Sequence, residues 1–106
     1  MRYNLKFSKE AENDLDGLFE YISLTLSAPQ AAKKLLAEIE RQIRNLTDHP
    51  FMCPSCMESP MRELGYRKLI IRNHIVIYSI SEPEKTVNIV RIFYGRQDYS
   101  RFFSIS

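Results

Sequence analysis

The chain has 106 residues, of which 44% are hydrophobic and 26% are charged, and its formal net charge is +2. This length permits one modest core, and the composition is that of a globular protein rather than of a disordered one. No apolar run approaches the roughly 18 residues that cross a membrane, and the first residues lack the basic-then-apolar pattern of a secretory signal. We therefore expect a single domain over residues 1–106, without a membrane partner, in the cytoplasm.

The first half of the chain predicts a short strand followed by two amphipathic helices. Residues 3–7 alternate apolar and polar side chains, as a strand does. Ser8 then has the position of a helix N-cap, and apolar residues recur at three- and four-residue spacing as far as Leu26. Pro29 begins a second helix, which we expect to end near Thr47. So short a connection predicts an antiparallel hairpin whose joint apolar face covers one side of a sheet.

Residues 48–63 contain three prolines and no sustained period, so they predict an irregular loop. Cys53 and Cys56 form a C-P-S-C motif within it. A zinc site needs further ligands, and a redox pair needs a helix N-terminus that follows a strand; the sequence offers neither context. We therefore expect free thiols in a reducing compartment, with no metal and no cofactor.

Three runs in the last third, residues 66–71, 74–81 and 85–94, are rich in β-branched and aromatic side chains. Two short turn-like links join them. This pattern predicts a three-stranded antiparallel meander. With the upstream elements it gives an α+β fold of order β-α-α-β-β-β.

Both faces of this meander are predicted to be apolar, although helices are available to cover only one. Strict alternation places on the second face Ile75, Ile77, Ile89, Arg91 and Phe93. Such a face needs a cover: the chain's own terminal aromatic residues, a second copy of the chain, or a segment of a partner. If a partner covers it, we expect Ile77→Asp to give a folded chain that has lost its partner.

The charge is unevenly distributed along the chain. From residue 61 onward there are eight Arg and Lys residues against four Asp and Glu residues. An excess of this sign fits an anionic partner such as RNA, DNA or an acidic polypeptide. The alternative is a basic surface that is merely solvated.

Several segments resemble the RelE/ParE superfamily of type II toxin–antitoxin toxins, which includes toxins of plasmid stabilisation modules. They are AENDLDGLFEYI, the P-x-A-A segment that opens the second helix, the I-x-x-L segment near its end, MRELGYRKLIIRNHIVIY and IVRIFYGRQD. The resemblance implies a small antiparallel sheet packed on a helical hairpin, and a growth-arresting toxin neutralised by a cognate antitoxin. It leaves the target open, because ParE-like members are reported to poison DNA gyrase and RelE-like members cut messenger RNA at the ribosome.

The resemblance also implies where a metal-free RNA-cleaving site would lie. Such a site needs a base, an acid and cations beside the phosphate. Lys68 matches a basic position on the second strand of the family, and Arg96 matches the position after the last strand. Two expected groups are absent, because Ile75 stands where an arginine is expected and Phe103 stands near the place of a terminal tyrosine.

The replacements open to such a site are Arg91 and Tyr99. His74 is a further candidate base, although we expect a histidine at a hairpin turn to be solvent-exposed. The segment Gly95–Asp98 resembles the ParE side of the superfamily more closely, or else forms a structural turn.

We therefore favour a ParE-like toxin that acts on DNA gyrase by binding. The alternatives are a ribosome-dependent endoribonuclease and an inactive toxin-like protein that binds its partner and regulates transcription, so whether the chain is an enzyme stays open. The residues expected to bind antitoxin or target are Ile75, Ile77, Ile89, Phe93, Phe102 and Phe103. A homo-oligomer is a further possibility.

Overall fold

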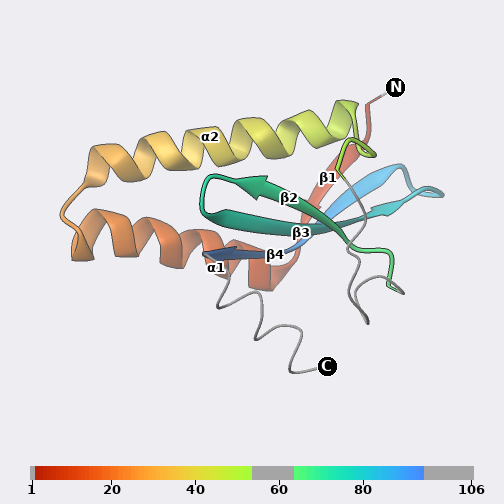
Figure 1. The fold of residues 1–106 in the computed structure, drawn as a ribbon. Helices are drawn as coiled ribbons and strands as arrows, with labels where there is room; N and C mark the ends of the chain where they lie inside the picture. The colour runs from red at the N-terminus through yellow and green to blue at the C-terminus, as the bar shows by residue number, and fades with distance from the viewer. Residues whose placement is uncertain (1, 54–63, 95–106) are drawn as a thin grey trace.

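The computed structural model describes residues 2–53 and 64–94 (Figure 1). Its elements follow the predicted order β-α-α-β-β-β, with one π-helical turn after the first helix. They are β1 (Asn4–Phe7), α1 (Lys9–Glu20), η1 (Tyr21–Thr25), α2 (Pro29–Asp48), β2 (Arg67–Ile71), β3 (His74–Ser81) and β4 (Thr86–Tyr94).

Capping and turn-forming residues determine where the helices begin and end. The hydroxyl of Ser8 accepts a hydrogen bond of 2.9 Å from the backbone N–H of Ala11, which caps the start of α1. Ser27 has a positive φ of 51° just after η1, and Pro29 occupies the first turn of α2. The two helices are therefore joined by a short, sharply turned connection, as the sequence predicts (Figure 1).

The four strands form one sheet in the order β1-β4-β3-β2. Strands β2, β3 and β4 make the predicted antiparallel meander, whereas β1 pairs with β4 in parallel. The sheet is therefore mixed, and the antiparallel sheet implied by the resemblance holds for three of its strands. The parallel pairing ends at Phe7, which lies opposite Ile89.

The helices cover one face of this sheet and form the main core with it. From the helices, Ala11, Ile39, Ile43 and Leu46 are buried there. The strands contribute the side chains that point toward them, namely Leu69, Ile71, Val76, Tyr78, Val87, Ile89 and Ile92. Burial of apolar area at about 25 cal/mol per Å² is what holds the two layers together.

A β-bulge in β4 changes which of its residues face the helices. Ile77 lies opposite Arg91 and Tyr78 lies opposite Ile89, so Val90 is an extra residue between the two pairs. Ile89 consequently packs in the helix-side core, and Val90 packs on the other face. The prediction that Ile89 shares a face with Ile77 is wrong, because strict alternation does not survive the bulge.

The second face of the sheet carries a smaller cluster of Ile75, Ile77 and Phe93. These side chains are 9%, 0% and 6% exposed, and Tyr66 and Val90 pack against them. These three side chains are therefore covered within the chain, and the expectation that they bind a partner stays a prediction. Among the described residues of this face, Ile70 on the edge strand is the large apolar side chain that is mostly exposed, at 62%.

Candidate functional site

The structure brings two of the proposed basic residues onto the same face of the sheet. Lys68 on β2 lies opposite Ile77 on β3, which in turn lies opposite Arg91 on β4. Directly opposed residues point to the same side of a sheet. Lys68 and Arg91 therefore belong to one row across three strands, with the fully buried Ile77 between them.

Arg91 is held by a carboxylate from α1. Its Nε donates to Asp14 at 2.9 Å, and a terminal guanidinium nitrogen donates to the other carboxylate oxygen at 3.1 Å. The guanidinium also lies 5.0 Å from the ring centroid of Phe93. A bidentate pair of this kind fixes both the position and the plane of the guanidinium.

Asp14 also binds the exposed backbone of β4 beyond the point where its pairing with β1 ends. Its carboxylate accepts a hydrogen bond of 2.9 Å from the backbone N–H of Ile92. Ser8 provides two more bonds to this edge, from its N–H to the carbonyl of Ile89 and from its hydroxyl to the carbonyl of Val90. The start of α1 thus takes over the hydrogen bonds that a longer first strand would make.

Sequence reasoning missed Asp14, although a signal was present. It falls three residues after the buried Ala11 and directly before Leu15, and so lies on the stripe of α1 that faces the sheet. A carboxylate on a core-facing stripe needs a partner.

A second set of contacts ties the end of the described loop to the sheet. The hydroxyl of Tyr78 donates to the carbonyl of Pro50 at 3.0 Å, and burial raises the pKa of this tyrosine. Arg67 donates to the carbonyl of Cys53 and lies 5.0 Å from the ring centroid of Phe51. Cys53 itself is buried and is a free thiol. These contacts fix residues 50–53 against β2 and β3.

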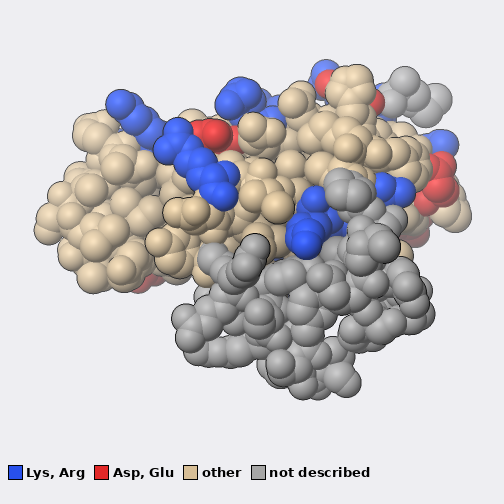
Figure 2. Space-filling view, viewed as in Figure 1, with Lys and Arg blue, Asp and Glu red and all other residues tan. Residues whose placement is uncertain are grey.

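The other described cations of the meander also have partners. Arg72 pairs with Glu38 of α2 at 2.9 Å, and Lys85 pairs with Glu82 at 3.2 Å. Figure 2 shows Lys and Arg side chains spread over this side of the molecule, with acidic side chains beside several of them. Most of the described Arg and Lys residues of the meander are thus engaged within the chain.

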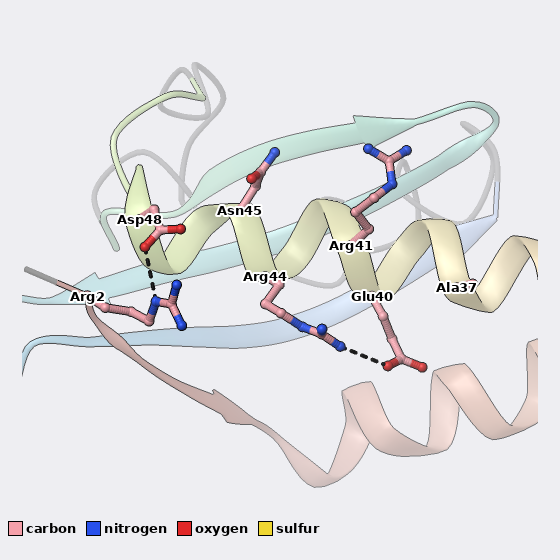
Figure 3. Close-up of a pocket in the computed structure, with 7 residues that line it drawn as sticks. All are labelled: Arg2, Ala37, Glu40, Arg41, Arg44, Asn45 and Asp48. Carbon is pink, nitrogen blue, oxygen red and sulfur yellow. Dashed lines mark hydrogen bonds and ion pairs between the residues drawn. The ribbon is translucent and has the colours of Figure 1, made fainter.

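A hollow of about 460 Å³ along the outer side of α2 is lined by three arginines (Figure 3). Two of them are paired: Arg2 with Asp48 at 3.1 Å and Arg44 with Glu40 at 3.5 Å. Arg41, which also lines the hollow, points away from these two pairs in Figure 3. Exposed pairs of this kind contribute little stability, and their nearly balanced charge gives no strong anion site.

His74 is buried rather than exposed as predicted. It begins β3 and is 5% exposed, and its ring lies 5.1 Å from that of Tyr94. Burial lowers the pKa of His74, and the backbone of Ile71 opposes this shift in part without completing a hydrogen bond to either ring nitrogen. Burial therefore favours the neutral form of this imidazole.

The sequence model of the ParE toxin of the type II toxin–antitoxin system parDE matches residues 5–99. The chain belongs to the ParE toxin family. No curated protein is similar enough in sequence to match it.

Solved structures share the ParE-family fold of this chain. A chromosomal ParDE toxin–antitoxin system from P. aeruginosa matches with a TM-score of 0.69 and 21% identity, over 90% of this chain and 98% of that one. The RelBE2 toxin–antitoxin complex from Mycobacterium tuberculosis matches with a TM-score of 0.64 and 19% identity, over 89% of this chain and 99% of that one. A mutant of the E. coli toxin RelE in the free state matches with a TM-score of 0.66 and 14% identity, over 98% of this chain and 93% of that one.

Part of the predicted site of this ParE-family chain lies outside the described residues. This holds for Arg96, Tyr99, Phe102 and Phe103, and for Cys56 of the C-P-S-C motif. Within residues 2–53 and 64–94, no three His, Cys, Asp or Glu side chains gather in a way that could hold a metal ion. Over the same residues, no helix has the length and apolar character to cross a membrane.

Proposed function

We propose that this toxin of a type II toxin–antitoxin system inhibits growth by binding DNA gyrase, and that a cognate antitoxin neutralises it. The family match over residues 5–99 supports the ParE side of the superfamily. Several of the structural relatives are complexes of a toxin with its antitoxin, which supports an antitoxin as the partner.

The observation that favours binding over RNA cleavage is the pairing of Arg91 with Asp14. A nuclease of the RelE type needs cations directed at a phosphate, where they offset its developing charge. The charge of Arg91 is instead offset by a carboxylate at 2.9 Å. Lys68 lies two strands away across the buried Ile77, a separation of about 10 Å between strand backbones.

The second candidate is a ribosome-dependent endoribonuclease. The shared face of Lys68 and Arg91 supports it, because a phosphate bound along that face would meet both cations. In that case Lys68, Arg91, Arg96 and Tyr99 remain the proposed catalytic residues. His74 is buried on the helix side of the sheet, away from the face of Lys68 and Arg91, and is therefore a poor candidate for their base.

The test is expression of the chain in a bacterial host with and without the protein encoded beside it. We expect growth arrest without the neighbour, a DNA-damage response with intact messages, and inhibition of purified gyrase in a supercoiling assay. Early cleavage of messages at ribosomes would support the nuclease instead. Undisturbed growth would identify the inactive binding protein.

The variant Arg96→Ala tests, in the same experiment, whether Arg96 belongs to the site. Because its position is polar and follows the last strand, we expect the unfolding free energy to change by no more than about 0.5 kcal/mol. We expect growth arrest to weaken. A folded variant that arrests growth as strongly as the wild type would remove Arg96 from the site under either target.

A further inference from the structure

The turn that joins the two helices carries a group of exposed apolar side chains. Three of them are more than half exposed: Tyr21 at 51%, Leu24 at 73% and Leu26 at 54%. Among the described residues, no other large apolar side chain is as exposed as Leu24. In Figure 1 this hairpin tip (residues 21–28) projects beyond the strands of the sheet. Exposed apolar side chains gathered at one place mark an interaction surface, whereas scattered ones do not.

The hairpin tip is also uncharged, whereas surface turns are usually rich in polar residues. Residues 21–32 form the longest stretch of the chain without Asp, Glu, Lys or Arg. In the view of Figure 2, the outermost end of the molecule, where the helices are joined, shows none of these side chains. A nucleic acid or another highly charged partner therefore has nothing to pair with at this point. The surface that meets the hairpin tip must itself be apolar.

The backbone of the hairpin tip is arranged at a cost to the stability of the free chain. Residues Tyr21–Thr25 form a π-helical turn, a rare conformation that is frequent at functional sites. Ser27 has a φ of 51°, which strains a residue other than glycine. The buried hydroxyl of Ser23 has no hydrogen-bond partner among the described residues. We expect such features at a contact surface rather than at an ordinary connection.

The charged residues that bound the uncharged stretch have opposite signs. Glu20 ends α1, and Lys33 lies in the second turn of α2. Both are exposed, and neither forms an ion pair within the part of the chain that the structure describes. A surface with an apolar centre, an acid on one side and a base on the other is complementary to a second copy of itself.

We propose that the hairpin tip is the contact between two copies of the chain, which are related by a two-fold axis. Tyr21, Leu24 and Leu26 of one copy pack against the same side chains of the other. The axis places α1 of each copy opposite α2 of its partner, so that Glu20 meets Lys33 twice. The other two-fold arrangement, with α1 opposite α1, is disfavoured because it sets like charges against each other. This inference goes beyond the proposed function and does not depend on it.

The size of the contact sets the strength of the association. Stable protein interfaces bury about 1,200–2,000 Å² in total, and a contact confined to two turns is smaller. We therefore expect a dissociation constant on the order of 10–100 µM, so that the chain is monomeric when dilute and dimeric when concentrated.

The first test measures the mass of the purified full-length chain by analytical ultracentrifugation, over a concentration series that spans this range. We expect a reversible equilibrium between monomer and dimer. Leu24→Ser should weaken the dimer by about tenfold, and Ile70→Ser, at an exposed apolar position on the edge strand, by less than about twofold. The melting temperature of the dilute Leu24→Ser chain should match that of the wild type, because this side chain is mostly exposed.

Charge reversal tests the two-fold pairing itself. Glu20→Lys and Lys33→Glu should each weaken the dimer by about fivefold or more, since each sets like charges against each other at two places. An equimolar mixture of the two variants should associate about as well as the wild type, because both pairs of the mixed dimer again join an acid to a base. High salt should reduce the differences among these variants.

A wild-type chain that stays monomeric throughout the series would overturn the proposal. Loss of binding to the protein encoded beside it in Leu24→Ser would then assign the hairpin tip to that protein. Equal weakening by Leu24→Ser and Ile70→Ser would indicate unspecific association and would also overturn it. Charge variants that associate like the wild type, or a mixture that does not recover, would exclude the two-fold pairing of Glu20 with Lys33.

Discussion

Asp14 and Arg91 are 77 positions apart in the chain, yet two hydrogen bonds of 2.9 and 3.1 Å join their side chains. The same carboxylate accepts the backbone N–H of Ile92. Asp14 therefore couples the position of a cation on one face of the sheet to the position of helix α1 at its edge. Loss of Asp14 would therefore disturb both the guanidinium of Arg91 and the packing of α1 at this edge.

The first prediction concerns this carboxylate. Asp14→Ala removes the acceptor of the Ile92 N–H and two hydrogen bonds from Arg91, so we expect a loss of about 2 kcal/mol in unfolding free energy. Most of the loss should come from the N–H, because the Arg91 side chain is 36% exposed and solvent screens its charge. Urea unfolding measures it. The exposed neighbour Asp16→Ala should change stability by no more than about 0.5 kcal/mol, and an equal loss in both would contradict the assignment.

The second prediction concerns the buried hydroxyl of Tyr78. Tyr78→Phe removes the bond to the carbonyl of Pro50 and leaves that carbonyl without its partner. We expect the unfolding free energy to fall by about 1–2 kcal/mol, and residues 50–53 to become more accessible to hydrogen exchange. Tyr94→Phe is the control, because this side chain is 60% exposed. If the two substitutions have the same effect, the hydroxyl of Tyr78 does not anchor the loop.

The third prediction is a pH dependence of stability. Because burial lowers the pKa of His74 below its ordinary value of 6.5, the unfolded chain binds more protons than the folded chain as the pH falls. The contribution of His74 is therefore most favourable above pH 6.5 and declines as the pH falls below it. We expect the unfolding free energy to drop between about pH 7 and pH 5, and the drop to shrink in His74→Phe. An identical profile in His74→Phe would exclude this residue as the cause.

The fourth prediction concerns the stability of Ile77→Asp and differs from the expectation drawn from the sequence. Since Ile77 is fully buried, a carboxylate there should destabilise the fold by about 3 kcal/mol or more, rather than give a folded chain that has only lost its partner. Ile70→Asp, on the same face but 62% exposed, should change stability by less than about 1 kcal/mol. Circular dichroism during thermal unfolding compares the two. A cooperative, wild-type-like transition in Ile77→Asp would mean that this face opens readily.

The order and the bounds of the elements could be predicted because each one has a clear local pattern. The serine cap, the proline at the start of α2 and the β-branched runs are signals carried by a few neighbouring residues. The observed ends of the helical and strand segments lie within one or two positions of the predicted ends. The bulge at Val90 has no such local signal. In a strand that is apolar at nearly every position, an inserted residue leaves the composition unchanged while it reverses the alternation.

The candidate site was harder to predict because its contacts join distant parts of the chain. The sequence of α1 does not separate its solvated acidic residues from Asp14, which binds Arg91. Only the packing of α1 against β4 shows the difference. His74 was misjudged for the same reason. A residue next to a hairpin turn is usually exposed, but α1 and η1 enclose this one from the far end of the sequence.

The parallel pairing of β1 with β4 bears on when the protein can fold during its synthesis. The first strand emerges from the ribosome well before its partner, residues 86–89. Until then the helices have no complete sheet to pack on, and closing so long a loop slows the final step. The chain is therefore unable to complete its sheet before residues 86–89 have been made.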